Sequence, residues 1–275
     1  MLSRQFLFDR GGDSLKLRVI FLIFLDLLFL LLSSLAGSFG RIAYYAAFAV
    51  SISAGLVFVG KSSQGGLPRL AMTRSAAITS AALFAPTMLV VVLISMLTSY
   101  LLSLVGGSHT TDVSGNLIYE LARHALIPAV LEEILFRFIP LRLLIPKSRR
   151  GAIAVSALLF ALIHLNLFQI PYALFAGLVL AFITVASGSI LLAVLLHFMN
   201  NALSVLWMRN PDIAPEFIIS VLLVLSALSA LYVIRKRKKY KAELLYALSG
   251  ARVGFSPELL CMSLVCILVS IINLR

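Results

Sequence analysis

The chain has 275 residues, of which 61% are hydrophobic and 12% are charged, and its formal net charge is +12. Soluble domains carry about a quarter charged residues, so a globule of this composition would lack the polar surface that water requires. The basic excess lies mostly between apolar runs and has no interleaved aromatic residues that would stack on bases. The composition excludes a soluble or nucleic-acid-binding protein and predicts one integral membrane domain over residues 1–275.

Nine apolar runs follow one another along the chain, and most approach the roughly 20 residues that a helix needs to cross a bilayer. They cover residues 18–36, 42–60, 75–105, 118–145, 151–169, 171–187, 189–208, 214–234 and 254–273. The last run could instead lie at the membrane interface. The sequence therefore predicts an all-α, polytopic transmembrane helix bundle of eight or nine spans.

The connections that are rich in Lys and Arg alternate with connections that are poor in them. Basic clusters precede the first run and follow the second, fourth and eighth runs, whereas residues 106–117 contain no Lys or Arg. Cytoplasmic loops of membrane proteins carry this excess, where it also faces anionic lipid. We therefore expect a multi-pass protein of the cell membrane with a cytoplasmic N-terminus and, if all nine runs span, an external C-terminus.

Ionisable side chains inside apolar runs cost roughly 2.5–3.5 kcal/mol each on insertion scales, so they mark candidate functional sites. The fourth run contains Glu132, Glu133 and Arg137. Glu133 and Arg137 are four residues apart, so they meet on one helix face and can form an ion pair. Glu132 points about 100° away from that face. A carboxylate in this position, without the same partner, suits a general base.

Two further pairs of residues have the same spacing. Phe160 and His164 lie in the fifth run, and His197 and Asn201 lie in the seventh. At 1.5 Å per residue from the cytoplasmic ends, Glu132 and His164 lie roughly 20 Å deep. His197 and Asn201 lie roughly 12 and 18 Å deep on the same scale. These similar depths predict one polar chamber inside the bilayer.

Four more ionisable residues fall outside these pairs. Glu120, Arg123 and His124 are spaced so that Glu120 can meet either neighbour on one face, near the outer end of the fourth run. Their arrangement predicts interfacial solvation or a helix-packing ion pair. Asp26 lies deeper, in the first run, and the sequence names no partner for it.

In this order, the three groups resemble the motifs of the CPBP family, which comprises CAAX proteases and bacteriocin-processing enzymes and is also called the Abi family. The motifs are Glu132-Glu133-x-x-x-Arg137, Phe160-x-x-x-His164 and His197-x-x-x-Asn201. The resemblance covers about residues 118–205, the motif-bearing core. It implies an intramembrane endopeptidase that hydrolyses a peptide bond of a membrane-bound or lipidated protein or peptide.

The resemblance also implies a role for each motif residue. Glu132 would activate a water for attack on the peptide carbonyl, and His164 would hold and polarise that water. His197 and Asn201 would donate to the developing oxyanion, whose stabilisation is often the largest catalytic effect. The residues that would brace the site are Glu133, Arg137 and, behind His164, Phe160.

A metal-free glutamate mechanism is favoured, because the chain has no His-Glu-x-x-His motif. Zinc is the alternative cofactor, with Glu132, His164 and His197 as ligands of an open site. Two other functions stay open: a proton- or ion-coupled transporter, since intramembrane Glu and His also form proton relays, and a catalytically silent scaffold or immunity protein. A Glu132→Gln change would abolish a protease, alter coupling in a transporter and spare a scaffold.

Overall fold

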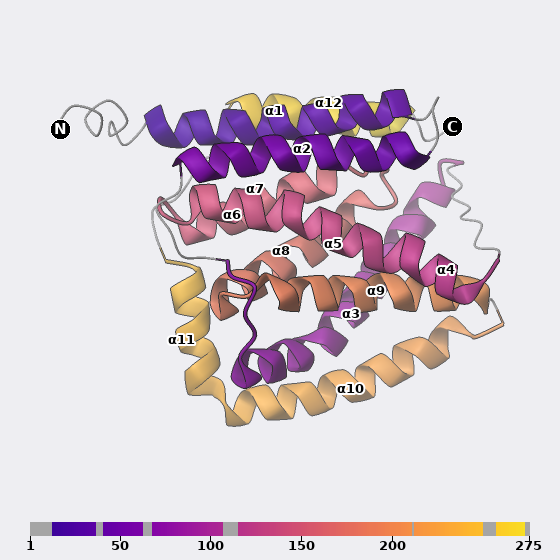
Figure 1. The fold of residues 1–275 in the computed structure, drawn as a ribbon. Helices are drawn as coiled ribbons and strands as arrows, with labels where there is room; N and C mark the ends of the chain where they lie inside the picture. The colour runs from indigo at the N-terminus through magenta and orange to yellow at the C-terminus, as the bar shows by residue number, and fades with distance from the viewer. Residues whose placement is uncertain are drawn as a thin grey trace.

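The computed structural model describes residues 13–36, 41–62, 68–106, 115–210, 212–249 and 257–272. Within these residues the chain is all-α, and most helices run along one common direction (Figure 1). The predicted fold class is confirmed. In chain order the elements are α1 (Asp13–Ala36), α2 (Arg41–Ser62), α3 (Arg74–Ser103), α4 (Leu117–Leu121), η1 (Ala122–Leu126), α5 (Ile127–Glu133), η2 (Ile134–Phe138), α6 (Ile139–Leu144), α7 (Arg149–Leu162), α8 (Ile170–Ser187), α9 (Ile190–Arg209), α10 (Pro215–Arg235), α11 (Arg237–Ala247) and α12 (Pro257–Ile272).

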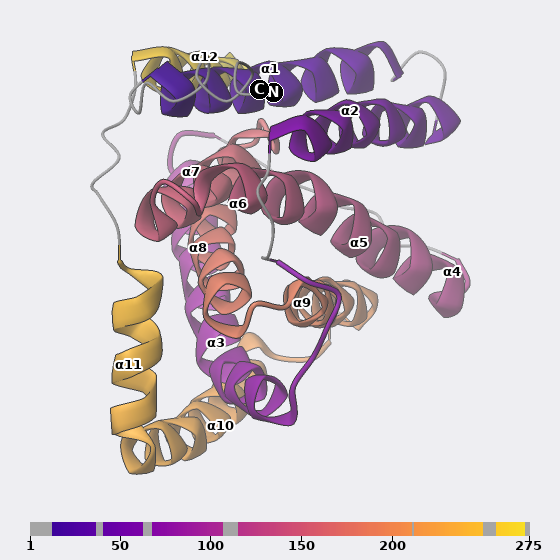
Figure 2. The same cartoon turned by 60° about the vertical axis from the view of Figure 1, so that its left-hand side comes forward.

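Helices α1, α2 and α12 form one outer layer of the bundle, as both views show (Figures 1 and 2). The rings of Phe21 and Phe58 stack with centroids 3.8 Å apart, which ties α1 to α2. Lys16 and Glu258 form an ion pair at 3.4 Å, so α1 and α12 begin at the same end of the bundle. This layer covers α6 and α7, on whose other side lie α8 and α9.

The fourth apolar run forms a continuous helical rod, α4 to α6, that contains the two π-helical segments η1 and η2. Pro128 and Pro140 each lie at the start of the α-helical segment that follows a π segment. Proline has no N–H and cannot bond to the carbonyl four residues earlier. The carbonyl of Phe136 is released in this way, and it accepts a hydrogen bond from Ser156 Oγ on α7. The irregular part of the rod is therefore anchored to its neighbour.

Helix α7 is shorter than the sequence predicted, because it ends at Leu162 and not at residue 169. The chain turns directly afterwards, with a φ of 44° at Leu165. Asn166 Oδ1 accepts a hydrogen bond from the Phe168 N–H at 2.8 Å, a side-chain turn that competes with helix continuation. The prediction that His164 lies within the helix of the fifth run is therefore wrong: this residue lies in the turn, just beyond the end of α7.

The contact between α7 and α8 is a close one. A Cβ added to Gly177 on α8 would lie 3.1 Å from Ala157 Cα and 3.2 Å from Phe160 Cδ1. The absent side chain lets the two backbones approach, as small residues do at helix interfaces in membranes. This contact fixes Phe160 from behind.

Helix α10 packs against α3 on the side of the bundle opposite α1, and α11 then turns away from the common helix direction (Figures 1 and 2). Lys239 on α11 donates to Ser75 Oγ at 2.7 Å and to Thr79 Oγ1 at 3.1 Å on α3. The basic segment that the sequence placed between two apolar runs is thus a short helix fastened to the start of α3.

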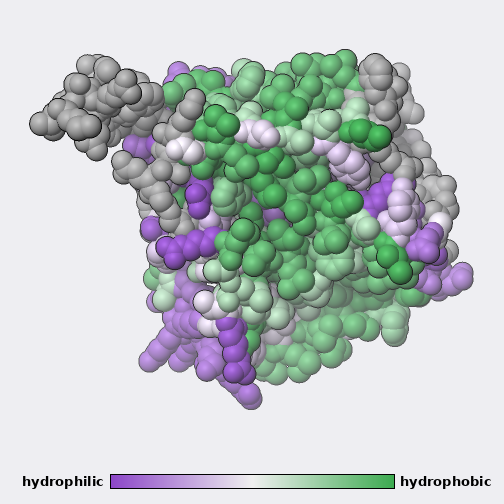
Figure 3. Space-filling view, viewed as in Figure 1, coloured by the Kyte–Doolittle hydropathy of each residue, from purple (hydrophilic) through white to green (hydrophobic). Residues whose placement is uncertain are grey.

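Five helices in the described part of the chain are long and apolar enough to cross a membrane: Ile42–Gly60 of α2, α3, α8, α9 and α10. A broad apolar band separates polar groups at the two ends of the face in Figure 3. The chain is therefore an integral membrane protein, while its eight or nine spans and its orientation stay predictions. Arg4 and Arg10, which belong to the predicted cytoplasmic arm, lie outside the described residues.

Candidate active site

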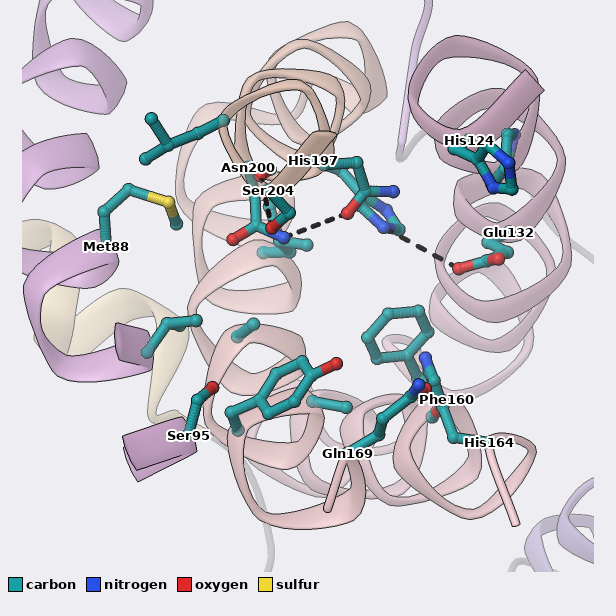
Figure 4. A pocket seen from close by; sticks show the side chains of 18 of the residues that line it. Met88, Ser95, His124, Glu132, Phe160, His164, Gln169, His197, Asn200 and Ser204 are labelled. Atoms are coloured by element: carbon teal, nitrogen blue, oxygen red, sulfur yellow. Dashed lines mark hydrogen bonds and ion pairs between the residues drawn. The ribbon is translucent and has the colours of Figure 1, made fainter. Parts of the chain in front are cut away.

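A cavity of about 850 Å³ lies among the helices, walled by parts of α3, α8, α9 and the α4–α6 rod. Glu132, His164, His197 and Asn201 all line it. Figure 4 shows Glu132, His164 and His197 around the same space. The structure therefore brings together, in one chamber, the four side chains that the depth estimate placed at similar levels.

Glu133 and Arg137 lie behind this chamber and do not line it. Both side chains are 0% exposed, and Glu133 Oε1 is 3.0 Å from Arg137 Nη1. This contact is an ion pair without good hydrogen-bond geometry, since no guanidinium nitrogen has a hydrogen-bond partner among the described residues. The guanidinium carbon lies 3.9 Å from the centroid of the Phe160 ring, a cation–π contact. The predicted brace is therefore a stack of Glu133, Arg137 and Phe160.

His197 connects the two carboxylates, which is a contact that the sequence did not predict. Its Nδ1 lies 2.8 Å from Glu133 Oε1, and its Nε2 lies 3.7 Å from Glu132 Oε2. Glu133 is paired with Arg137 and acts as an acceptor, so Nδ1 carries the hydrogen. The opposite nitrogen then faces Glu132 and the chamber (Figure 4). Nothing in the local sequence pattern indicates that His197 reaches Glu133, because the two residues lie on α9 and α5.

His164 is oriented by the backbone of its own turn. Its Nδ1 lies 2.9 Å from the carbonyl oxygen of Phe160. A carbonyl only accepts, so Nδ1 donates, and a neutral His164 ring leaves Nε2 as a hydrogen-bond acceptor. The Phe160 ring packs edge-on against both His164 and His197, with centroid distances of 5.1 and 5.5 Å. One aromatic ring therefore sets the positions of both histidines.

Asn201 is oriented by its neighbour Asn200. Asn200 Nδ2 donates to Asn201 Oδ1 at 3.0 Å, and both residues line the cavity. With its oxygen engaged in this way, Asn201 keeps its amide N–H groups as donors. The sequence motif singled out Asn201, and the structure adds Asn200 as the residue that positions it.

Two tyrosines complete the surroundings of Glu132. Tyr44 on α2 and Tyr172 on α8 line the cavity, and both interact electrostatically with Glu132. The sequence analysis did not identify them, because each is a single tyrosine in an apolar run with no motif around it. Only the folded arrangement of α2, α5 and α8 brings them to this carboxylate.

The ionisable residues outside the motifs have separate locations. Glu120 and His124, whose spacing allowed a contact within the helix, do meet, with His124 Nε2 3.0 Å from Glu120 Oε2. His124 also lines the cavity. Asp26 is buried in α1, does not line the cavity, and its carboxylate has no hydrogen-bond partner within the described residues.

The zinc alternative requires Glu132, His164 and His197 to converge on one point. Among the described residues, no group of three or more His, Cys, Asp or Glu side chains is arranged to hold a metal ion. In both histidines Nδ1 is engaged, by a backbone carbonyl in His164 and by Glu133 in His197, and Nε2 is left available, as in metal-ligating histidines. Zinc therefore stays the alternative to the metal-free glutamate mechanism, with Glu132, His164 and His197 as the residues that would hold it.

Comparison with known proteins gives one match. Residues 114–203 match a family model described as type II CAAX prenyl endopeptidase Rce1-like. Neither a curated protein nor a solved structure matches the chain. The matched segment includes all three motifs and nearly all of the predicted core at 118–205. The resemblance stated from the motifs is confirmed: residues 114–203 are similar to a CAAX-protease family, as the three motifs had indicated.

Proposed function

We propose that the protein is an intramembrane endopeptidase that hydrolyses a peptide bond with a water activated by Glu132. The match to a type II CAAX endopeptidase supports peptide hydrolysis. The observation that carries the proposal is the position of Glu132. Its carboxylate faces an 850 Å³ chamber that His164, His197 and Asn201 also line. A base, a water-holding acceptor and amide donors thus surround one space, as peptide hydrolysis requires.

The first step is the attack of water on the scissile carbonyl. The Glu132 carboxylate takes a proton from the water, while the His164 Nε2 lone pair accepts the second O–H and orients the oxygen. The water oxygen forms a bond to the carbonyl carbon, and the π electrons move to the carbonyl oxygen. General base catalysis of this kind contributes typically 10²- to 10⁴-fold to the rate.

The second step is the breakdown of the tetrahedral intermediate. The carbon–nitrogen bond breaks, and Glu132 returns its proton to the leaving nitrogen, so that the products are a carboxylic acid and an amine; transfer of the acid proton to the amine then gives a carboxylate and an ammonium group. Asn201 N–H and, when the ring is protonated, His197 Nε2–H would stabilise the oxyanion. Glu133 fixes the orientation of His197 through the 2.8 Å contact to Nδ1. Glu133 and Arg137 are therefore positioning residues.

The test is cleavage of an internally quenched peptide library by the purified protein in detergent, with the wild type compared with Glu132→Gln. We expect cleavage by the wild type that persists in the presence of a chelator and falls at least about 100-fold in the variant. Loss of cleavage with chelator and its recovery with zinc would replace the metal-free mechanism by a metal-dependent one. Cleavage that survives Glu132→Gln would remove the proposed base.

A further inference from the structure

The cavity occupies one half of the bundle along the helix direction. Helices α3 and α9 begin at the end that holds the start of α1, whereas the α4–α6 rod and α8 run toward that end (Figure 1). Each of these elements lines the cavity with residues from its half that is far from the start of α1. On these four wall elements the lining residues lie within 84–99 of α3, 196–208 of α9, 172–180 of α8 and 124–132 of the rod; α1, α2, α7 and the turn after α7 contribute the rest.

The end away from the cavity is strongly basic. Hydrogen bonds join its parts: Lys239 to Ser75 Oγ, Arg149 to Ser249 Oγ, and Arg142 to a backbone carbonyl before α3. The described basic residues at this end are Lys16, Arg18, Arg69, Arg74, Arg142, Lys147, Arg149, Arg150, Arg235, Lys236, Arg237, Lys238, Lys239 and Lys241.

The end near the cavity has a different charge composition. Among the described residues it carries Arg123 and Arg209 together with Glu120, Asp212 and Glu216. Cytoplasmic ends of membrane proteins hold the excess of Lys and Arg. The excess of Lys and Arg therefore predicts that the basic end is cytoplasmic, which would place the cavity in the non-cytoplasmic half.

Exposure along the cavity shows where it opens. Its lining is buried at Phe160 and His197, whereas Ser99, Ser204 and Met208 line it and are exposed. Met208, near the end of α9, is 47% exposed. Toward the basic end the space between α8 and α9 is filled by a buried apolar cluster of Leu180, Ile183, Leu192, Ala193 and Leu196. The cavity thus reaches the surface of the bundle beside Ser99, Ser204 and Met208 and is closed toward the basic end.

The wall also indicates what kind of chain would enter. No Lys or Arg occurs among the described residues that line the cavity. A free C-terminal carboxylate would have no cationic partner there, and burying it unpaired would be costly. The wall instead offers apolar surface with small polar groups on two facing helices, namely Thr87, Ser95 and Ser99 of α3 with Asn200 and Ser204 of α9. Such a wall suits an uncharged, internal stretch of polypeptide.

We propose that the chamber takes its substrate from the non-cytoplasmic side: an internal, uncharged segment of a membrane-anchored exported polypeptide, with its scissile bond at Glu132. The segment lies between α3 and α9 and enters past Ser99, Ser204 and Met208. This inference rests on the proposed peptidase function and assigns it a substrate class. A lipidated cytoplasmic C-terminus does not fit this class, because it would reach the basic end.

The side of entry is tested by cysteine labelling of the full chain in a Cys261→Ser background, which removes the exposed native thiol. Ser204→Cys and Ser99→Cys place a thiol at the mouth of the cavity, which is the opening beside Ser99, Ser204 and Met208. Lys238→Cys on α11 places a thiol at the basic end. A sulfonated, membrane-impermeant maleimide should label the two mouth cysteines in right-side-out vesicles and Lys238→Cys in inverted vesicles. Labelling of both mouth cysteines only in inverted vesicles would overturn the proposal.

Cleavage separates this inference from the function on which it rests. The wild type is reconstituted in vesicles, and a quenched apolar peptide with blocked ends is supplied on one side at a time, with the free-carboxylate form as comparison. We expect cleavage of the blocked peptide from the side that labels the mouth. If the peptide is cleaved in detergent, but in vesicles only when it is supplied on the side of the basic end, the proposed side of entry is wrong and the peptidase function stands. Absence of cleavage in detergent would contradict the peptidase, while labelling would still decide the side.

Discussion

Arg137 is the bulkiest fully buried side chain among the described residues, and its charge is balanced by very few groups. Glu133 lies 3.0 Å from its guanidinium, and the Phe160 ring faces it at 3.9 Å. The same carboxylate holds His197 at 2.8 Å. A single carboxylate therefore both balances the buried arginine and orients His197, for which we propose a catalytic role.

Replacing Arg137 with methionine should destabilise the protein strongly. The substitution leaves the Glu133 carboxylate buried without its cation, and breaking such a pair costs about 3 to 5 kcal/mol in the free energy of unfolding. Unfolding by a denaturing detergent in mixed micelles measures this. The double variant Glu133→Gln with Arg137→Met should recover part of the loss, and Arg74→Met, at an exposed arginine, should change stability by less than about 0.5 kcal/mol. Equal stability of Arg137→Met and Arg74→Met would contradict the role of the ion pair.

At this scale the spacing predicted the Glu133–Arg137 pair and allowed the Glu120–His124 contact, because four-residue spacing decides which side chains meet on a helix. It could not predict that His197 bridges Glu132 and Glu133, or that Tyr44 and Tyr172 approach Glu132. Those contacts join helices that are distant in the sequence, and their rotation about their axes depends on packing.

At the scale of elements, the position of Phe160 depends on how closely α7 and α8 pack. Gly177 faces Ala157 and Phe160, and an added Cβ would lie closer to both than an ordinary van der Waals contact. Phe160 in turn contacts Arg137, His164 and His197. A change in the contact between α7 and α8 would therefore displace Phe160 and, through it, the site residues that it touches.

A Gly177→Leu substitution should separate α7 from α8. Overpacking of this kind typically costs about 1 to 3 kcal/mol, and we expect a lower thermal unfolding temperature together with reduced peptide cleavage, since Phe160 is displaced. Gly60→Leu is the matched control, because a Cβ at Gly60 meets no atom within 4 Å. If the two variants unfold at the same temperature, the close contact does not hold the site.

Element boundaries were predictable where apolar runs are uninterrupted, as in α8, which the sequence placed at 171–187 and which spans Ile170–Ser187. They were not predictable at α7, where the turn at Leu165 and Asn166 ends the helix early. The π segments of the rod follow from Pro128 and Pro140, which mark a disturbance without specifying its geometry. Helix α11 was missed because its composition is basic and not apolar.

At the scale of the whole molecule, the fold places the chamber in one half of an apolar bundle and gathers basic residues at the opposite end. Composition alone predicted the membrane bundle, and loop charges predicted its orientation. The location of the chamber required the structure, because it depends on where α3, α8 and α9 leave space between them. Water, base and substrate carbonyl would meet only in this shared volume.

The most direct test of the account is a single turnover of peptide cleavage in ¹⁸O-labelled water, followed by mass spectrometry of the product and of the peptide of the enzyme that contains Glu132. Activation of water by Glu132 predicts one ¹⁸O atom in the newly formed carboxylate of the product and none in Glu132. Appearance of ¹⁸O in the Glu132 carboxylate would show that this residue attacks the substrate covalently, and it would contradict the proposed role as a base.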